Sequence, residues 1–315
     1  MTFRLFIILG LVGLSLGLLD RRRAKTATRD FAIWLCRIAL QCLSRPYQLR
    51  TGPCIIFAPH QDDETLGCGG LIARKRNEGL PVHVIFITDG SASHTGHPAV
   101  TAREVGDIRR REALAALAIL GVESCAIHFL DEADGTLKNL AAGRESALVT
   151  RLAGLIAWIQ PGEIFLPCSP DGSSEHDAAF GFVCAAVVQA GVQPDFWQYP
   201  VWSWWNPGLL IERMIFNQGY CVQPTEDFQP IKTRALARYQ SQLEPIPPWS
   251  EPALPPRTRA QLQLRPGIFL PLHPAAARRR CRRHSRDLTL PACIASSSSA
   301  RTFRRPMRRT TSACG

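Results

Sequence analysis

The chain has 315 residues, of which 46% are hydrophobic, so it can bury the core of one large α/β domain or of two small ones. Its net charge of +11 lies mainly at the C-terminal end, where residues 273–315 hold eleven arginines and one acid and leave residues 1–272 with a net charge of +1. A nearly neutral body argues against a protein that binds nucleic acid over its whole surface, and no specific nucleic-acid partner is expected.

The eleven cysteines bear on the redox compartment. They form no C-x-x-C pair, and several lie inside apolar runs, where cysteine behaves as a small hydrophobic side chain. We therefore expect reduced thiols in a reducing compartment.

The N-terminal residues 5–19, LFIILGLVGLSLGLL, form an apolar run that basic residues follow at 21–23 and 25. The run is shorter than the roughly 20 residues that span a bilayer, although thinning of the membrane accommodates some short spans. A cleavable signal peptide would have its basic cluster before the run and a small-residue cleavage site after it. Here the larger cluster follows the run and no such site is found.

We therefore expect residues 5–19 to associate with a membrane, with a buried or interfacial helix and a signal peptide as the alternatives. The positive-inside rule then places the body on the cytoplasmic face of that membrane. Without an anchor the protein would be cytoplasmic.

Predicted strands and helices alternate after a linking helix over residues 30–46. The alternation of strand and helix predicts an α/β fold, a Rossmann-like open, mostly parallel sheet with helices on both faces. Ligands bind such sheets at the carboxyl ends of the strands. The predicted strands cover residues 54–59, 82–90, 125–130, 163–172 and 196–202, and the predicted helices cover residues 66–79, 103–120, 145–159 and 176–191.

The first predicted strand ends in a cluster of metal-binding residue types, His60, Asp62 and Asp63. Neighbouring carboxylates repel each other by about 1 kcal/mol in water at 4 Å and by several times more when partly buried, and a divalent cation removes this penalty. Histidine with carboxylate suits zinc, and a catalytic zinc takes three protein ligands and keeps a position open. His176, at the end of another strand, is the best candidate for the third ligand, which leaves Asp62 to accept a proton from water.

Two other functions of this stretch are considered. Asp63 or Glu64 could cap the following helix, although a cap needs one acid and not a histidine with three acids. The glycines of LGCGG faintly resemble a dinucleotide-binding loop, but the full G-x-G-x-x-G spacing is absent and the three acids would repel a pyrophosphate.

The stretch APHQDDETLGCGG resembles the signature of the PIG-L/LmbE-like family of zinc-dependent de-N-acetylases. The resemblance extends over roughly residues 50–270 in ITDGSASH (87–94), IRRREALAALAILGV (108–122), SPDGSSEHDAA (169–179) and KTRALARYQSQL (232–243). It implies that His60, Asp63 and His176 hold Zn²⁺ and that Asp62 is the general base. It also implies a metal-dependent N-deacetylase, a hydrolase acting on a non-peptide C–N amide bond, whose substrate is an N-acetylated amino sugar of the N-acetylglucosaminyl type.

The sequence departs from the family at DGSSEH. Many members have a histidine, proposed to act as an acid or to stabilise the oxyanion, where this chain has Ser173, and Glu175 replaces the aspartate beside the zinc histidine. A serine does not shuttle protons near pH 7. Three alternatives follow: Asp62 carries the proton both ways, another histidine such as His94 substitutes, or the activity is low.

Three further residues are candidates for holding the sugar, namely Asp89, His94 and Arg109. Arg109 and Glu112 are three residues apart on one predicted helix, so an ordinary helix-face ion pair is the alternative for Arg109. His94 lies in a Ser/Gly loop and could simply be exposed to solvent.

We expect the domain organisation to follow these segments. Residues 1–29 are the apolar N-terminal segment with its basic flank, residues 30–50 contain the linking helix, residues 51–272 form the PIG-L/LmbE-like deacetylase domain, and residues 273–315 form an Arg/Ser-rich, disordered tail. Two rival functions remain, a metal-dependent phosphoesterase and a catalytically impaired binding protein of the same fold.

Overall fold

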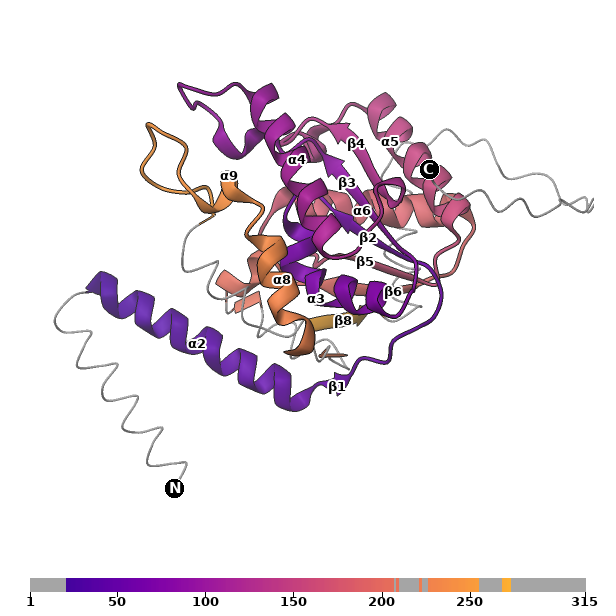
Figure 1. Cartoon of the computed structure of the whole chain (residues 1–315), viewed down its shortest axis with the longest axis horizontal. Helices are drawn as coiled ribbons and strands as arrows, with labels where there is room; N and C mark the ends of the chain where they lie inside the picture. Colours follow the sequence, from indigo (N-terminus) through magenta and orange to yellow (C-terminus); the bar gives the residue numbers. More distant parts are fainter. Residues whose placement is uncertain (1–20, 207, 210–220, 223–225, 255–267, 273–315) are drawn as a thin grey trace, which may run out of the picture.

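The computed structural model describes residues 21–206, 208–209, 221–222, 226–254 and 268–272 (Figure 1). Within these residues a single eight-stranded sheet has the strand order β1-β7-β8-β6-β5-β2-β3-β4. The strands are β1 (Arg45–Pro46), β2 (Cys54–Ala58), β3 (Val82–Thr88), β4 (Ile127–Glu132), β5 (Glu163–Pro167), β6 (Asp195–Tyr199), β7 (Cys221–Val222) and β8 (Ile268–Leu272). The helices are α2 (Arg21–Leu43), α3 (Asp63–Asn77), α4 (Ala102–Ile119), α5 (Ala142–Ile159), α6 (Ser174–Ala190), α8 (Gln229–Leu236) and the short α9 (Gln240–Leu243).

The centre of the sheet is parallel, as the sequence predicts. Strands β4, β3, β2, β5 and β6 are neighbours in that order and all run in the same direction. Strand β8 pairs antiparallel with β6, and this strand was not predicted because it is a short apolar segment beyond a proline-rich stretch.

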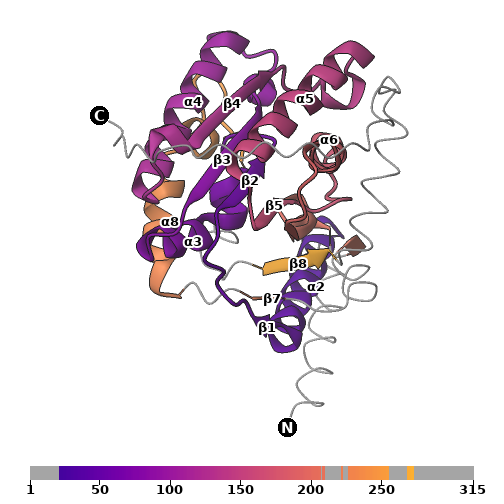
Figure 2. The same ribbon diagram turned by 90° about the vertical axis from the view of Figure 1, so that its right-hand side faces the viewer.

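Helices cover both faces of the sheet, which confirms the predicted fold class (Figure 2). One face packs against α3, α4 and α8 through side chains such as Ile56 and Phe86. The other face packs against α5 and α6 through the alternate side chains of the same strands, such as Ile55 and Ile85. Because the central strands are buried on both faces, they read in the sequence as nearly continuous apolar runs.

Several element boundaries differ from the predictions by a few residues, and two of these differences have a clear local cause. The helix expected over residues 30–46 runs from Arg21 to Leu43 and ends before the Arg45–Pro46 pair, because a residue that precedes proline disfavours the helical conformation. The strand expected over residues 125–130 lies over Ile127–Glu132, because Ser124–Ala126 form a 3₁₀ turn.

The proposed anchor at residues 5–19 and the tail at residues 273–315 lie outside the described residues. Among the helices that the structure does describe, none combines the length and apolar character needed to cross a membrane. The cysteines whose side chains are described form no disulfide.

The glycines after the first strand serve close packing. A Cβ atom on Gly67 would lie 2.2 Å from the ring of Tyr199, so no larger residue fits between α3 and β6. The Tyr199 hydroxyl donates a hydrogen bond of 2.6 Å to the carbonyl oxygen of Phe57 and fixes the ring there. This contact explains a glycine in LGCGG without a nucleotide.

A buried charged group lies at the amino ends of the strands. Glu163, the first residue of β5, accepts hydrogen bonds from the Tyr47 hydroxyl at 2.6 Å, the Lys75 ammonium at 2.7 Å and the Trp197 indole at 3.0 Å. Lys75 is fully buried and also donates to the carbonyl oxygen of Arg50. These bonds join the segment before β2 to α3, β5 and β6.

Candidate metal centre

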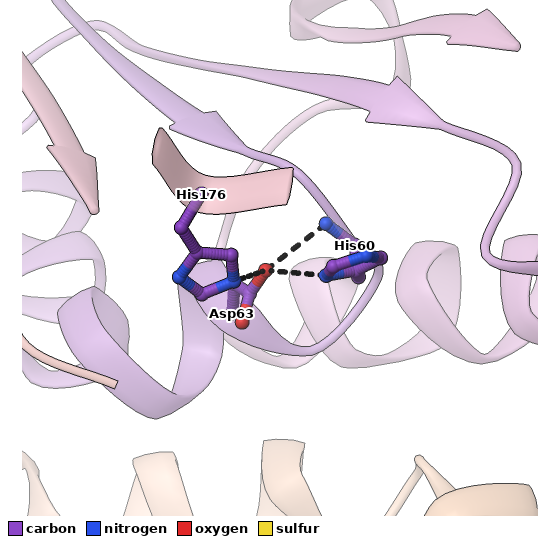
Figure 3. A group of neighbouring side chains, drawn as sticks. All are labelled: His60, Asp63 and His176. Atoms are coloured by element: carbon purple, nitrogen blue, oxygen red, sulfur yellow. Dashed lines mark hydrogen bonds and ion pairs between the residues drawn. The ribbon is translucent and has the colours of Figure 1, made fainter. Parts of the chain in front are cut away.

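The predicted metal ligands meet at the carboxyl ends of the parallel strands. His60 follows β2, Asp63 begins α3 and His176 lies in the first turn of α6 after β5. The strand-end geometry expected from the sequence therefore brings together residues 116 positions apart, which Figure 3 shows on either side of one Asp63 oxygen.

The three side chains are close enough to share one ion. Asp63 Oδ2 lies 3.3 Å from His60 Nδ1 and 3.2 Å from His176 Nε2. The candidate ligand atoms of the three residues all lie within 4.8 Å of one another. The arrangement supplies two imidazole nitrogens and one carboxylate oxygen.

His176 is oriented by a carboxylate that the sequence analysis did not assign. Its Nδ1 lies 2.8 Å from Asp171 Oδ2, and Asp171 also accepts the backbone N–H groups of Trp202 and Ser203 and the Ser203 hydroxyl. A carboxylate only accepts, so His176 Nδ1 carries the proton of this bond and Nε2 is left to face Asp63.

His60 is oriented in the same way by Asp134, in the loop after β4. His60 Nε2 lies 3.0 Å from Asp134 Oδ1, which turns Nδ1 toward Asp63. Histidine ligands of metals commonly donate their second ring N–H to a carboxylate, so this pair of contacts is what a metal site requires. Asp134 stands 74 residues from His60, and only its place in a third acidic strand-end loop could have indicated it from the sequence.

The residues present fit a zinc ion. His176 Nε2 is buried, makes no hydrogen bond and lies 3.2 Å from Asp63 Oδ2, so a cation bound here would compete only with a proton for its lone pair. Two nitrogens and one oxygen form a three-ligand set that leaves a fourth position open on a tetrahedral zinc. The alternative of a helix cap is not supported, because the carboxylates of Asp63 and Glu64 accept the backbone N–H groups of His60 and Asp62, which precede α3. Asp62, at the N-cap position, makes no capping bond through its side chain.

Electrostatics distinguish the two adjacent aspartates. Burial raises the pKa of Asp62 to about 6, although the Arg109 guanidinium, 3.1 Å away, opposes this. Burial would also raise the pKa of Asp63, but the two neighbouring imidazoles more than offset this and hold it below the usual range. Asp63 therefore remains an anionic ligand, while Asp62 can exchange a proton near neutral pH.

The two imidazoles compete for protons and for a cation. Burial lowers their pKa values, but the adjacent carboxylates outweigh it and raise the pKa of His60 to about 9 and that of His176 to about 10. A metal and a proton bind the same lone pair, so acidification weakens metal binding at this site.

A cavity of about 280 Å³ opens over this centre. His60, Asp62 and Asp63 lie on its wall together with Arg109. The rest of its lining is mainly apolar and comes from several segments far apart in the sequence, with Leu66, Ala92, Ser93, Asp134, Val201, Trp202, Gln242, Ala253 and Leu254.

Arg109 is bound to the site loop and not to its helix neighbour. Its guanidinium donates to the carbonyl oxygens of Gly90 at 3.2 Å and Gln61 at 2.7 Å and pairs with Asp62. Glu112 instead accepts both the backbone N–H and the hydroxyl of Ser241 at 2.7 Å. The alternative of an Arg109–Glu112 ion pair is therefore wrong.

Asp89 and His94 lie outside the cavity wall. Asp89 Oδ1 accepts the backbone N–H groups of Ser91 and Asp134, so it shapes the loops beside the site. His94 is 4% exposed and stacks on Trp249 with ring centroids 5.7 Å apart, so the alternative that it is solvent-exposed is wrong.

The two departures in DGSSEH have structural roles. Ser173 is the N-cap of α6, and its hydroxyl accepts the backbone N–H of His176 at 3.5 Å. Glu175 accepts the backbone N–H of Leu137 through one oxygen, and burial raises its pKa. Neither residue lies on the wall of the cavity over the metal centre.

The fold is that of an α/β protein, and two histidines and one carboxylate form a candidate metal site at the carboxyl ends of its strands. Residues 55–187 match the model of the PIG-L family, described as GlcNAc-PI de-N-acetylase, in agreement with the resemblance seen in the motifs. The diacetylchitobiose deacetylase of Thermococcus kodakarensis is 28% identical over 243 residues, which cover 70% of this chain and 86% of that protein. Such relatives, named as deacetylases, support a hydrolytic N-deacetylase.

Solved structures show the same fold. A deacetylase triple mutant involved in teicoplanin biosynthesis has a TM-score of 0.53 and 16% identity and covers 70% of this chain and 97% of its own. GalB, the 4-carboxy-2-hydroxymuconate hydratase of Pseudomonas putida KT2440, has a TM-score of 0.50 and 21% identity and covers 61% of this chain and 80% of its own. The fold thus serves both a deacetylase and a hydratase, and the reaction must be argued from the site.

Proposed function

We propose that this chain is a zinc-dependent hydrolase that removes the acetyl group from an N-acetylated amino sugar of the N-acetylglucosaminyl type. The observation that carries the proposal is the buried Nε2 of His176, which makes no hydrogen bond and faces Asp63 and His60, with Asp62 beside them on the cavity wall. The family match and the relative named diacetylchitobiose deacetylase support the choice of reaction and of substrate class.

His60, Asp63 and His176 would hold the ion. When bound, zinc supplies a Lewis acid that polarises the acetamide carbonyl and lowers the pKa of water. Asp62 accepts the proton of the water that attacks the carbonyl carbon, and Arg109 fixes one oxygen of the Asp62 carboxylate for this purpose.

Asp62 also returns the proton to the leaving nitrogen. Of the other donors considered from the sequence, Ser173 is engaged as the cap of α6 and His94 is buried beneath Trp249 away from the cavity wall. The C–N bond breaks as the nitrogen is protonated, so that one water and one acetamide give acetate and a protonated amine. The carboxyl oxygen of Asp62 that is not paired with Arg109 carries the proton between the two steps.

The sugar lies in the cavity against Arg109 and the apolar wall. Asp89 and His94 contribute by fixing the loop of residues 89–97, from which Ser93 reaches the cavity. The size of the cavity, about 280 Å³, suits a group of the size of one sugar ring.

The decisive experiment measures acetate release from a panel of N-acetylglucosaminyl compounds by the zinc-loaded full chain and by Asp62→Asn. Acetate from at least one compound, lost in the variant, supports the proposal. Hydrolysis of a phosphodiester that depends on His60, without acetate from any compound, would favour the phosphoesterase. Saturable binding of a sugar without any turnover would favour the impaired binding protein.

For the location, we propose that residues 5–19 hold the protein at the cytoplasmic face of a membrane. The support is the apolar run and the basic cluster that follows it, at the start of helix α2. Fractionation of cells expressing the tagged full chain or a chain beginning at Asp30 tests this, with the full chain expected in the membrane pellet. Equal distribution of the two chains in the soluble fraction would reject the anchor.

A further inference from the structure

Asp62 has a backbone conformation that residues with a side chain rarely adopt. Its φ is 145° and its ψ is −28°, whereas the flanking residues lead directly from β2 into helix α3. Such a conformation persists only when surrounding contacts enforce it, and such outliers cluster at functional sites. The contacts that hold Asp62 therefore decide where its carboxylate lies.

The side chain of Glu64 binds the backbone of Asp62. The Asp62 N–H donates to Glu64 Oε2 at 3.1 Å, and the Asp62 carbonyl oxygen accepts the N–H of Leu66 at 2.8 Å as the first bond of α3. The side chain of Asp62 pairs with Arg109. Glu64 therefore stabilises the turn at Asp62 through the Asp62 backbone N–H.

Glu64 is in turn held by a residue from the far end of the chain. It is fully buried, and its Oε1 accepts the hydroxyls of Thr65 and Tyr239. Tyr239 is 1% exposed and stands 175 positions away, between helices α8 and α9. Neither Glu64 nor Tyr239 lies on the cavity wall, so neither touches a substrate there.

The segment that carries Tyr239 is itself fixed to the site. Ser241 binds Glu112 of α4 through two hydrogen bonds, and Gln242 lies on the cavity wall. The position of Tyr239 is thus set by the same few residues that close one side of the cavity.

We propose that Tyr239 and Glu64 form a positioning pair that holds Asp62 in the geometry required for proton transfer. The inference rests on the proposed function, because it assigns a role within that reaction. A hydrogen bond from Tyr239 fixes the Glu64 carboxylate, the Glu64 carboxylate fixes the Asp62 N–H, and the strained turn then directs the Asp62 side chain to Arg109 and the cavity. Since a displacement of about 1 Å in a catalytic group can lower the rate about 10²-fold, the pair acts on the chemical step without touching substrate.

The chain offers a matched control at the opposite end of the sheet. Tyr47 donates to buried Glu163 as Tyr239 donates to buried Glu64, and both tyrosines are almost fully buried. Tyr47→Phe and Tyr239→Phe therefore remove the same type of bond, but only the second bond leads to Asp62.

The test compares the two variants and wild type as zinc-loaded full chains, with kcat and KM for acetate release, zinc content, the midpoint of unfolding, and NMR exchange of the Asp62 amide proton. We expect Tyr239→Phe to lower kcat about 10-fold or more. Its KM and zinc content should stay within twofold of wild type, and its Asp62 amide should exchange faster. Tyr47→Phe should lose comparable stability but keep kcat and Asp62 exchange. Glu64→Gln should lower kcat at least as far as Tyr239→Phe, because its amide nitrogen replaces one of the two carboxylate oxygens that accept these hydrogen bonds.

The positioning role of Tyr239 and Glu64 would be rejected if Tyr239→Phe kept the kcat and the Asp62 amide exchange of wild type. It would also be rejected if the loss of rate in this variant were explained by a lower zinc content or a higher KM. The two hypotheses fail differently. A wild type that releases no acetate rejects the proposed function and this role with it, whereas an active wild type with an unaffected Tyr239→Phe rejects the positioning role alone.

Discussion

Charged side chains are buried at both ends of the central strands, but the two ends differ in how completely these side chains are hydrogen-bonded. At the amino ends, Glu163 has hydrogen-bond partners on both oxygens, from Tyr47, Trp197 and Lys75. At the carboxyl ends, partners are missing. Among the described residues, six buried side-chain polar atoms lack a hydrogen bond, and four of these surround the metal centre, on Gln61, Arg109, Glu175 and His176.

This difference in hydrogen bonding distinguishes buried polar groups that stabilise the fold from those that are free to bind a ligand. A buried ion pair with every partner present is tolerated, and removing one partner leaves an uncompensated charge. A buried donor or acceptor without a partner costs about 1–3 kcal/mol, so natural folds retain one chiefly where a ligand completes it. The unpaired atoms at the carboxyl ends are therefore the better guide to function than the pairs at the amino ends.

The largest effect on rate is expected for Asp62→Asn. The variant keeps the size of the side chain and all three metal ligands but cannot accept a proton, so kcat should fall about 10²–10⁴-fold. Zinc content should remain that of wild type. A variant within threefold of the wild-type kcat would exclude Asp62 as the base.

The ionisation of Asp62 should set the acidic limb of the plot of kcat/KM against pH. A general base works only when ionised, so kcat/KM should fall as the pH falls through the pKa of Asp62. Burial raises that pKa to about 6 in the chain itself, and a nearby cation lowers it, so the limb should lie at or below pH 6. A limb well above pH 7 would point to a different base.

At the amino ends, Lys75→Met should act on stability and not on rate. Removing the ammonium leaves the buried Glu163 with only the exposed Arg50, 3.9 Å away, as a cation, which should lower the free energy of unfolding by about 3–5 kcal/mol. Urea unfolding with kcat normalised to folded protein measures both quantities. The double variant Lys75→Met/Glu163→Gln should recover part of the loss, and a fall in normalised kcat would contradict the separation of the two ends.

An intermediate effect, on zinc affinity, is expected for Asp171, whose carboxylate orients the proposed metal ligand His176. Asp171→Asn weakens the bond that holds His176 Nδ1, so zinc affinity should fall about 10–100-fold without loss of the ligand itself. Competition with a chelator measures the affinity. An unchanged affinity would mean that backbone packing alone orients the histidine.

The smallest effect is expected for Ser173→Ala. The variant removes the cap of α6 and should cost about 1 kcal/mol of stability, with kcat changed less than threefold if Asp62 carries the proton both ways. Ser173→His would restore a proton-donating side chain at this position and should raise the rate. A hundredfold loss in Ser173→Ala would show instead that the hydroxyl takes part in the reaction.

The sequence predicts much of the site because two of its three proposed ligands, His60 and Asp63, lie in one short motif. His60, Asp62 and Asp63 belong to one strand end, and the alternation of strands and helices places His176 at the same edge of the sheet. The parallel sheet follows from the same alternation.

What the sequence misses depends on contacts between distant segments. Asp134 and Asp171 orient the ligands through single hydrogen bonds, and Tyr239 reaches Glu64 from 175 positions away. His94 is buried and stacks on Trp249, which comes from a distant segment of the chain. No periodicity or local motif encodes such pairings, which arise from how the loops pack after the sheet has formed.

The central claim is that His60, Asp63 and His176 hold one zinc ion, and metal analysis of the purified protein tests it most directly. Wild type should contain about one zinc per chain, the stoichiometry of an open three-ligand site. Each of His60→Ala and His176→Ala should lose most of that zinc while remaining folded by circular dichroism. Unchanged metal content in both variants would contradict the account.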